Sequence, residues 1–174
     1  MSVLKSIRIN PLRSVLSSAL ALALASTGGG VGAHLHWRVE ITASDGGSFR
    51  GIGEMELRGT VGGADLTTPA TTINSSSVVN GSNSAANAID NNAASSGWLS
   101  QESTIAEWIT VTFPEPVSIA QLSIIGPFNQ IGSSPRDFML LYSDDGVSFT
   151  PALSVTNETG WMVGVARLFN IPGA

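Results

Sequence analysis

From residue 35 onward the chain alternates apolar and polar residues, with no sustained helical period of about 3.6 residues. The segment 35–42, LHWRVEIT, places every second side chain on one face, which is typical of a strand that buries that face. Further strand candidates lie at residues 52–57, 72–79, 108–113, 117–125, 138–143 and 166–171. A helical bundle or coiled coil is excluded, because the chain has 19 glycines and a single lysine.

Turn sequences separate these strand candidates. Asp144-Asp145-Gly146 stands between two apolar segments and predicts a hairpin. Pro114 is expected to end the strand that begins at residue 108, since proline cannot continue a hydrogen-bonded ladder, and residues 85–90 predict one helical turn. About six to eight short strands joined by turns predict an all-β sandwich or jelly roll, which we place at residues 34–174.

Residues 1–33 precede this domain and differ from it in composition. A basic stretch is followed by an apolar run at 15–25 and a glycine-rich linker at 28–33. One interpretation is a secretory signal peptide, because Ala23 and Ala25 precede Ser26 in the small-x-small pattern of a cleavage site. The other is a retained anchor, a short helix from Ser14 that needs a partner surface because it is too short to be stable alone.

Charge and cysteine content exclude several classes of function. The chain has 13 acidic and 8 basic residues, a net charge of −5, so nucleic acid is not expected as a partner. It has no cysteine, which excludes disulfides, thiolate zinc sites, iron–sulfur clusters and cysteine nucleophiles. The apolar run at 15–25 is too short for a bilayer core of about 30 Å, so no transmembrane span is expected.

Three segments resemble a known family. They read SAANAIDNNAASSGWLS at 84–100, EWITVTFPEPVSIAQLSIIG at 107–126 and SPRDFMLLYSDDGVSFTPAL at 134–153. In this order and spacing they are similar to the discoidin, or coagulation-factor V/VIII C-type, domain and its carbohydrate-binding relatives. The resemblance implies a galactose-binding-like β-sandwich jelly roll.

The chain order departs from that family. The segment 37–59, WRVEITASDGGSFRGIGEMELRG, resembles the strand pair with which such domains usually end, but here it comes first. The resemblance therefore implies a circular permutation, with residues 60–83 as the new connection; surface termini that lie close together make such a rearrangement easy. This arrangement is similar to modules of bacteriophage and prophage tail proteins.

The resemblance also implies a structural Ca²⁺. In the family the loop after the first motif holds this ion with a carboxylate, backbone carbonyls and a hydroxyl, together with a Glu from the final strand. The matching residues are Asp90, Asn92, Ser95, Glu54 and Glu56. Oxygen ligands suit Ca²⁺, although Asn91 replaces the family's glycine. The alternative is a metal-free loop closed by Asx-type hydrogen bonds.

Two loops are candidates for carbohydrate binding. We expect Trp161, in a loop between strands, to expose its indole as a platform for a sugar ring. Phe128, Asn129, Gln130 and Arg136 belong to a second loop, whose planar polar groups suit hydroxyls and carboxylates. The alternative is that these are ordinary loop residues. Trp98 and Trp108 match core positions of the family, so packing is their expected role.

Catalytic sites have little support. His34 and His36 would share one face of a strand but supply only half a zinc site. No serine stands in a nucleophile elbow, which disfavours a Ser/His/Asp triad. Glu54 and Glu56 are better explained by the family's metal position than by glycoside hydrolysis.

The leading interpretation is a non-enzymatic virion structural protein of a bacteriophage: a tail, fibre or decoration component. Residues 1–33 would attach it to other virion proteins, and the discoidin-like domain would bind host-surface glycans or neighbouring subunits. A symmetric homo-oligomer is expected, with a trimer as its form. One alternative is a secreted, extracellular bacterial lectin or adhesin with a cleaved signal peptide, and another is a purely architectural jelly roll.

Overall fold

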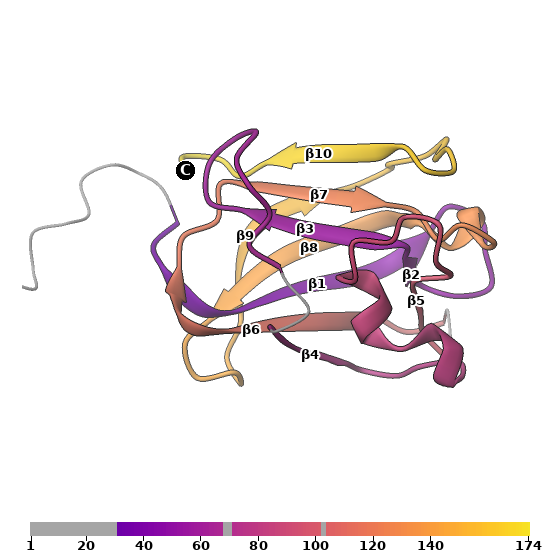
Figure 1. Cartoon of the computed structure of the whole chain (residues 1–174), viewed down its shortest axis with the longest axis horizontal. Helices are drawn as coiled ribbons and strands as arrows, with labels where there is room; N and C mark the ends of the chain where they lie inside the picture. Colours follow the sequence, from indigo (N-terminus) through magenta and orange to yellow (C-terminus); the bar gives the residue numbers. More distant parts are fainter. Residues whose placement is uncertain (1–30, 68–70, 102–103) are drawn as a thin grey trace, which may run out of the picture.

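The computed structural model describes residues 31–67, 71–101 and 104–174 (Figure 1). Strands predominate in this part of the chain, with three short 3-10 helices between them. The strands are β1 (His34–Ser44), β2 (Gly51–Ile52), β3 (Glu54–Arg58), β4 (Thr72–Ser75), β5 (Trp98–Leu99), β6 (Glu107–Val117), β7 (Gln121–Ile125), β8 (Pro135–Ser143), β9 (Thr150–Val155) and β10 (Ala166–Asn170). The 3-10 helices are η1 (Gly81–Asn83), η2 (Ala85–Ala88) and η3 (Ile131–Ser133).

The larger sheet has the strand order β4-β6-β1-β8-β9, and every neighbouring pair is antiparallel. β1 lies at its centre, although it is the first of the described strands, and Val39 pairs with Ile109 on one side and Leu140 on the other. The alternation expected at 35–42 is confirmed, because Trp37, Val39 and Ile41 are all buried.

A second sheet, in the order β10-β7-β3, faces the first across the core, as the upper layer in Figure 1 shows. Met55 and Leu57 of β3 and Leu122 and Ile124 of β7 alternate inward and are fully buried. β2 and β5 form a separate short ladder. This arrangement confirms the expected all-β sandwich and brings loops from distant parts of the sequence to the same ends of the molecule.

The expected end of the strand at Pro114 is wrong, because β6 continues to Val117. His36 pairs with Thr112, but His34 pairs with Val117, so the register shifts between these two pairs. Residues 114–116 lie in the shifted stretch, where no described ladder partner requires a proline amide. The prolines are therefore tolerated inside the strand.

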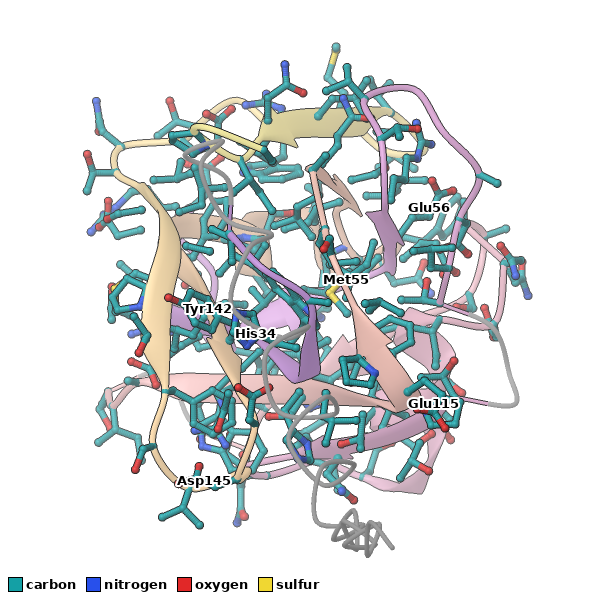
Figure 2. The ribbon with its side chains drawn as sticks, turned by 90° about the vertical axis from the view of Figure 1, so that its left-hand side faces the viewer. His34, Met55, Glu56, Glu115, Tyr142 and Asp145 are labelled. Atoms are coloured by element: carbon teal, nitrogen blue, oxygen red, sulfur yellow. The ribbon has the colours of Figure 1, made fainter. Side chains whose placement is uncertain are left out.

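The hairpin expected at residues 144–146 is confirmed between β8 and β9. The Asp145 carboxylate accepts hydrogen bonds from the amides of Val147 and Ser148, both at 2.8 Å. These bonds to the charged form hold the pKa of Asp145 well below its usual range. The turn is therefore fixed by local hydrogen bonds. Figure 2 shows Asp145 at the tip of this hairpin.

Candidate functional site

A cavity of about 590 Å³ opens between loops at one end of the sandwich. Figure 1 shows the loops concerned on the right: the segment that carries η1, the turn before β2 and the segment before η3. The lining residues are Phe49, Val79, Asn80, Gly81, Ser82, Asn83, Ser96, Leu99, Asn129 and Gln130. These described lining residues combine apolar side chains, amides and hydroxyls, and none of them is charged.

Hydrogen bonds from the loop backbone hold the floor of this cavity. Val79 donates its amide to the Leu99 carbonyl at 3.0 Å, and the buried Trp98 donates its indole N–H to the Ser77 carbonyl at 2.8 Å. Asn80 caps η1 by accepting from the Ser82 amide. The segment 77–83 is therefore fixed against β5 before any ligand binds.

Two side-chain amides of the lining take no part in these hydrogen bonds. Asn129 and Gln130 are exposed, and within the described residues no hydrogen bond engages either side chain. Asn83, in contrast, is buried and directs its amide towards the Gly97 carbonyl. Phe49 is half-buried and supplies the aromatic surface of the cavity. An apolar ring beside planar amides suits a ligand rich in hydroxyl groups.

The structure brings only part of the expected carbohydrate site together. Asn129 and Gln130 line the cavity, and Phe128 beside them is 44% exposed but is not among the lining residues. Arg136 lies outside the lining, and both its Nε and Nη2 donate to Asp137 at 2.9 Å. The guanidinium expected to recognise a ligand is thus already bonded to its neighbour.

The expected exposure of Trp161 is wrong. Its side chain is only 7% exposed and packs in the core, where its indole N–H donates to the Pro135 carbonyl at 3.1 Å. Arg167 covers the ring, 4.7 Å from the centroid. The aromatic residue at the cavity is instead Phe49, which our sequence analysis missed; its only sequence signal is its position in a glycine-rich turn.

The two tryptophans that were expected to pack in the core differ. Trp98 is fully buried, which confirms the expected packing role. Trp108 is half-buried and lies outside the core, with the Arg38 guanidinium 4.0 Å from its ring centroid. Phe149 covers the other side of the guanidinium at 3.7 Å. The expected core position of Trp108 is therefore wrong.

A second site lies in the loop after η2. The Glu54 side chain is buried, and its Oε2 accepts the Asn92 amide at 3.1 Å. Asp90 accepts the same amide at 2.9 Å, so both carboxylates converge on one N–H group. The other carboxylate oxygen of Glu54, Oε1, is also buried, and no described residue forms a hydrogen bond with it. Burial and the nearby charge of Asp90 raise the pKa of Glu54 to about 7.

These residues fit the Ca²⁺ that the family implies. Oε1 of Glu54 is a hard oxygen ligand, and Oε2 of the same carboxylate already bonds to the loop at Asn92. Asn91 has a φ of 59°, so it adopts the left-handed conformation that the family's glycine would take. Ser95 donates its amide to the Asn92 carbonyl at 2.8 Å, which keeps its hydroxyl in the same loop. The Asp90–Asn92 hydrogen bond is also the Asx-type contact of the metal-free alternative.

Glu56 does not join this loop. It forms an ion pair with Arg58 on the same strand. Within the described residues no group of three or more His, Asp or Glu side chains is placed to hold a metal. A Ca²⁺ ion would therefore depend on Asp90, Glu54 and neutral oxygens of the loop.

The histidine pair does not form a metal site. His34 stacks on Tyr142, with ring centroids 4.0 Å apart (Figure 2). The Nδ1 atom of His34 lies 3.1 Å from Asp144. His36 instead places its Nδ1 2.9 Å from the Thr112 hydroxyl. The two imidazole rings therefore contact different neighbours and do not share a ligand position.

Comparison with known protein families gives a match. The model of the F5/8 type C domain matches residues 72–172, more than half of the chain. Neither the curated proteins nor the solved structures gave a match. The matched segment begins at β4, so β1 and β3, which belong to the two main sheets, lie outside it. In the described part of the chain, no helix is long and apolar enough to cross a membrane.

Proposed function

The chain belongs to the F5/8 type C domain family of carbohydrate-binding or protein-interaction modules, and on that premise we propose that it binds a neutral glycan without catalysing a reaction. The proposed site is the cavity lined by Phe49, Asn129 and Gln130. The single observation that carries this proposal is the uncharged lining, in which two amides without other partners lie beside an aromatic ring.

The lining also supports the class of ligand. Acidic sugars need a cation to offset the desolvation of their carboxylate, and none of the described residues that line the cavity is a cation. Neutral hexoses carry hydroxyl groups that both donate and accept, as do the amides of Asn129 and Gln130. We therefore expect neutral sugars to bind better than uronic or sialic acids.

A glycan array tests the proposed site. The parent protein is expected to bind neutral glycans, and the double variant Asn129→Ala, Gln130→Ala to lose at least about tenfold in affinity, since each amide loses hydrogen bonds worth about 1 kcal/mol. Val147→Ala serves as the control, because Val147 is 83% exposed and outside the cavity lining. Equal binding by the parent and the double variant would contradict the site, and binding by acidic glycans alone would contradict the ligand class.

We propose a structural Ca²⁺ for the second site. Glu54 and Asp90 supply the charged ligands, and the loop of Asn92 and Ser95 supplies neutral oxygens. The support is the buried Glu54 oxygen that has no partner. Such an ion would neutralise two converging carboxylates and tie β3 to the loop after η2.

We propose that the domain is a surface component of a bacteriophage particle, attached through residues 1–33, most of which lie outside the described residues. The support is indirect: β1 comes first in the chain but lies centrally in its sheet, and the family match starts only at residue 72. This pattern favours the circular permutation inferred from the sequence. The alternative remains a secreted lectin whose leader is cleaved.

Mass spectrometry of the protein from its natural source separates these two interpretations. The virion proposal expects the peptide around 15–25 to be retained and the protein to co-purify with particles. A protein that begins at Ser26, free of particles, would contradict the anchor and support the secreted lectin.

A further inference from the structure

The strand β10 ends the smaller sheet and leaves one edge unpaired. Within the described residues it pairs with β7 alone. The Ile171 amide donates to the Ala120 carbonyl on the β7 side, at 2.9 Å. Because the hydrogen-bonding direction alternates along an antiparallel strand, Ala166, Leu168 and Asn170 direct their N–H and C=O groups away from β7. Three successive outward positions are thus ready to pair with another strand.

Exposed apolar side chains gather beside this edge. Nine large apolar residues are exposed in the described part of the chain, and four of them fall within residues 162–168. These are Met162, Val163, Val165 and Leu168, with exposures of 61%, 46%, 44% and 54%. A cluster of this kind beside an open edge marks an interaction surface more often than scattered apolar residues do.

The devices that usually protect sheet edges are missing from β10. The strand contains no proline or lysine, and its one charged residue, Arg167, is ion-paired with Glu158 and donates to the Gly160 carbonyl at 2.6 Å. Two of the other edges, those of β9 and β3, differ. β9 carries Pro151 at its edge, and the outer side of β3 is closed by the bridge between Arg58 and Asp65.

We propose that β10 pairs antiparallel with β10 of a second copy of this chain, about a twofold axis at Leu168. In this register Leu168 faces the partner's Leu168, and Ala166 faces the partner's Asn170. All the outward backbone groups of the strand then pair, which no other register achieves for a strand spanning Ala166–Asn170.

The charges and side chains of the strand suit this occupant. Arg167 falls opposite the partner's Phe169, so the twofold axis does not oppose two arginines. The exposed Leu168 side chains meet directly and bury each other's apolar surface. A second copy supplies an identical edge without net charge. An acidic partner would gain little at this edge, because Arg167 is already paired with Glu158.

The pairing is independent of the glycan cavity, because no cavity-lining residue belongs to residues 162–170. A dimer would therefore carry two cavities and bind multivalent surfaces with greater avidity than one domain. Failure of glycan binding and failure of dimerisation are separately measurable.

Analytical ultracentrifugation of the full chain tests the proposal. A single strand pair is a small interface, so association is expected in the micromolar range, and samples should extend to about 200 µM. The parent is expected to dimerise, and Leu168→Lys to weaken association at least about tenfold, since it opposes like charges at the axis. Val147→Lys, at another exposed position on the β8–β9 hairpin, is expected to leave the dimer intact.

Ala166→Pro provides a second variant if Leu168→Lys disturbs the fold. It removes an outward N–H that β7 does not use, at the first residue of the strand, where proline is tolerated. It is expected to weaken the dimer while the circular dichroism spectrum stays that of the parent. A parent that is monomeric at about 200 µM, or a dimer or trimer that neither β10 variant weakens, would overturn the proposal.

Discussion

Addition of Ca²⁺ to chelator-treated protein is expected to raise the midpoint of thermal unfolding by about 5–10 °C. A ligand at about 100 times its Kd adds about 2.7 kcal/mol to the stability of the folded state, and in a chain of this length each kcal/mol shifts the midpoint by about 2–4 °C. The physical reason is the pair of carboxylates from Glu54 and Asp90, which converge on one amide with one buried oxygen unpartnered. Calorimetry in calcium and in chelator measures the effect.

Two substitutions on the same strand make this prediction specific. Glu54→Gln is expected to abolish the calcium effect and, in chelator at pH 8, to be at least as stable as the parent, because a neutral amide avoids a buried charge without a partner. Glu56→Gln is the matched control and should keep the calcium shift, since Glu56 pairs with Arg58 outside the loop. A parent insensitive to Ca²⁺ would favour the loop closed by Asx-type hydrogen bonds, and a shift retained in Glu54→Gln would place the ion elsewhere.

Gly97→Ala is expected to destabilise the domain by about 3 kcal/mol or more. Gly97 precedes β5 with a φ of 64°, and an added Cβ would lie 2.2 Å from the Ile52 carbonyl oxygen and 2.5 Å from Gly53 Cα. Both contacts are with backbone, which cannot move aside as a flexible side chain can. Chemical denaturation measures the loss. Glycan binding should weaken with it, since the Gly97 carbonyl is the partner of Asn83 in the cavity wall.

Gly164→Ala is the matched control for this prediction. Gly164 has a similar φ of 72°, but an added Cβ there meets nothing within 4 Å. It is therefore expected to lose only about 1 kcal/mol, from the strain of the left-handed conformation. Similar losses in the two variants would show that backbone conformation, and not the close approach of β2 to Gly97, makes glycine necessary.

Local sequence patterns were sufficient to predict most of the fold. The alternation of apolar and polar residues in β1 and the hairpin at 144–146 are both encoded by residues close together in the sequence. Both predictions are confirmed. Pro114 was misleading because its effect depends on a register shift against β1, which is a property of the paired strands. The sequence therefore predicts the positions of strands better than it predicts the register shifts between paired strands.

The candidate sites were less predictable, because exposure is a tertiary property. Trp161 lies in a polar loop, which predicts exposure, but Pro135 and Arg167 cover it in the folded domain. Trp108 lies in a strand whose side chains alternate between two faces, and the second sheet covers only one of these faces. Trp108 lies on the other, outer face. Phe49 carries no signal of its own, since the cavity forms only when the loops around 79–83 and 129–130 come together.

The proposed function depends most on the binding of a neutral sugar in the loop cavity. Titration of isotope-labelled protein with galactose, followed by amide NMR, tests this binding directly. We expect saturable shifts concentrated at residues 79–83 and 129–130, which depend on Asn129 and Gln130, and no comparable shifts with a uronic acid. Shifts centred elsewhere, or preference for the acidic sugar, would contradict it.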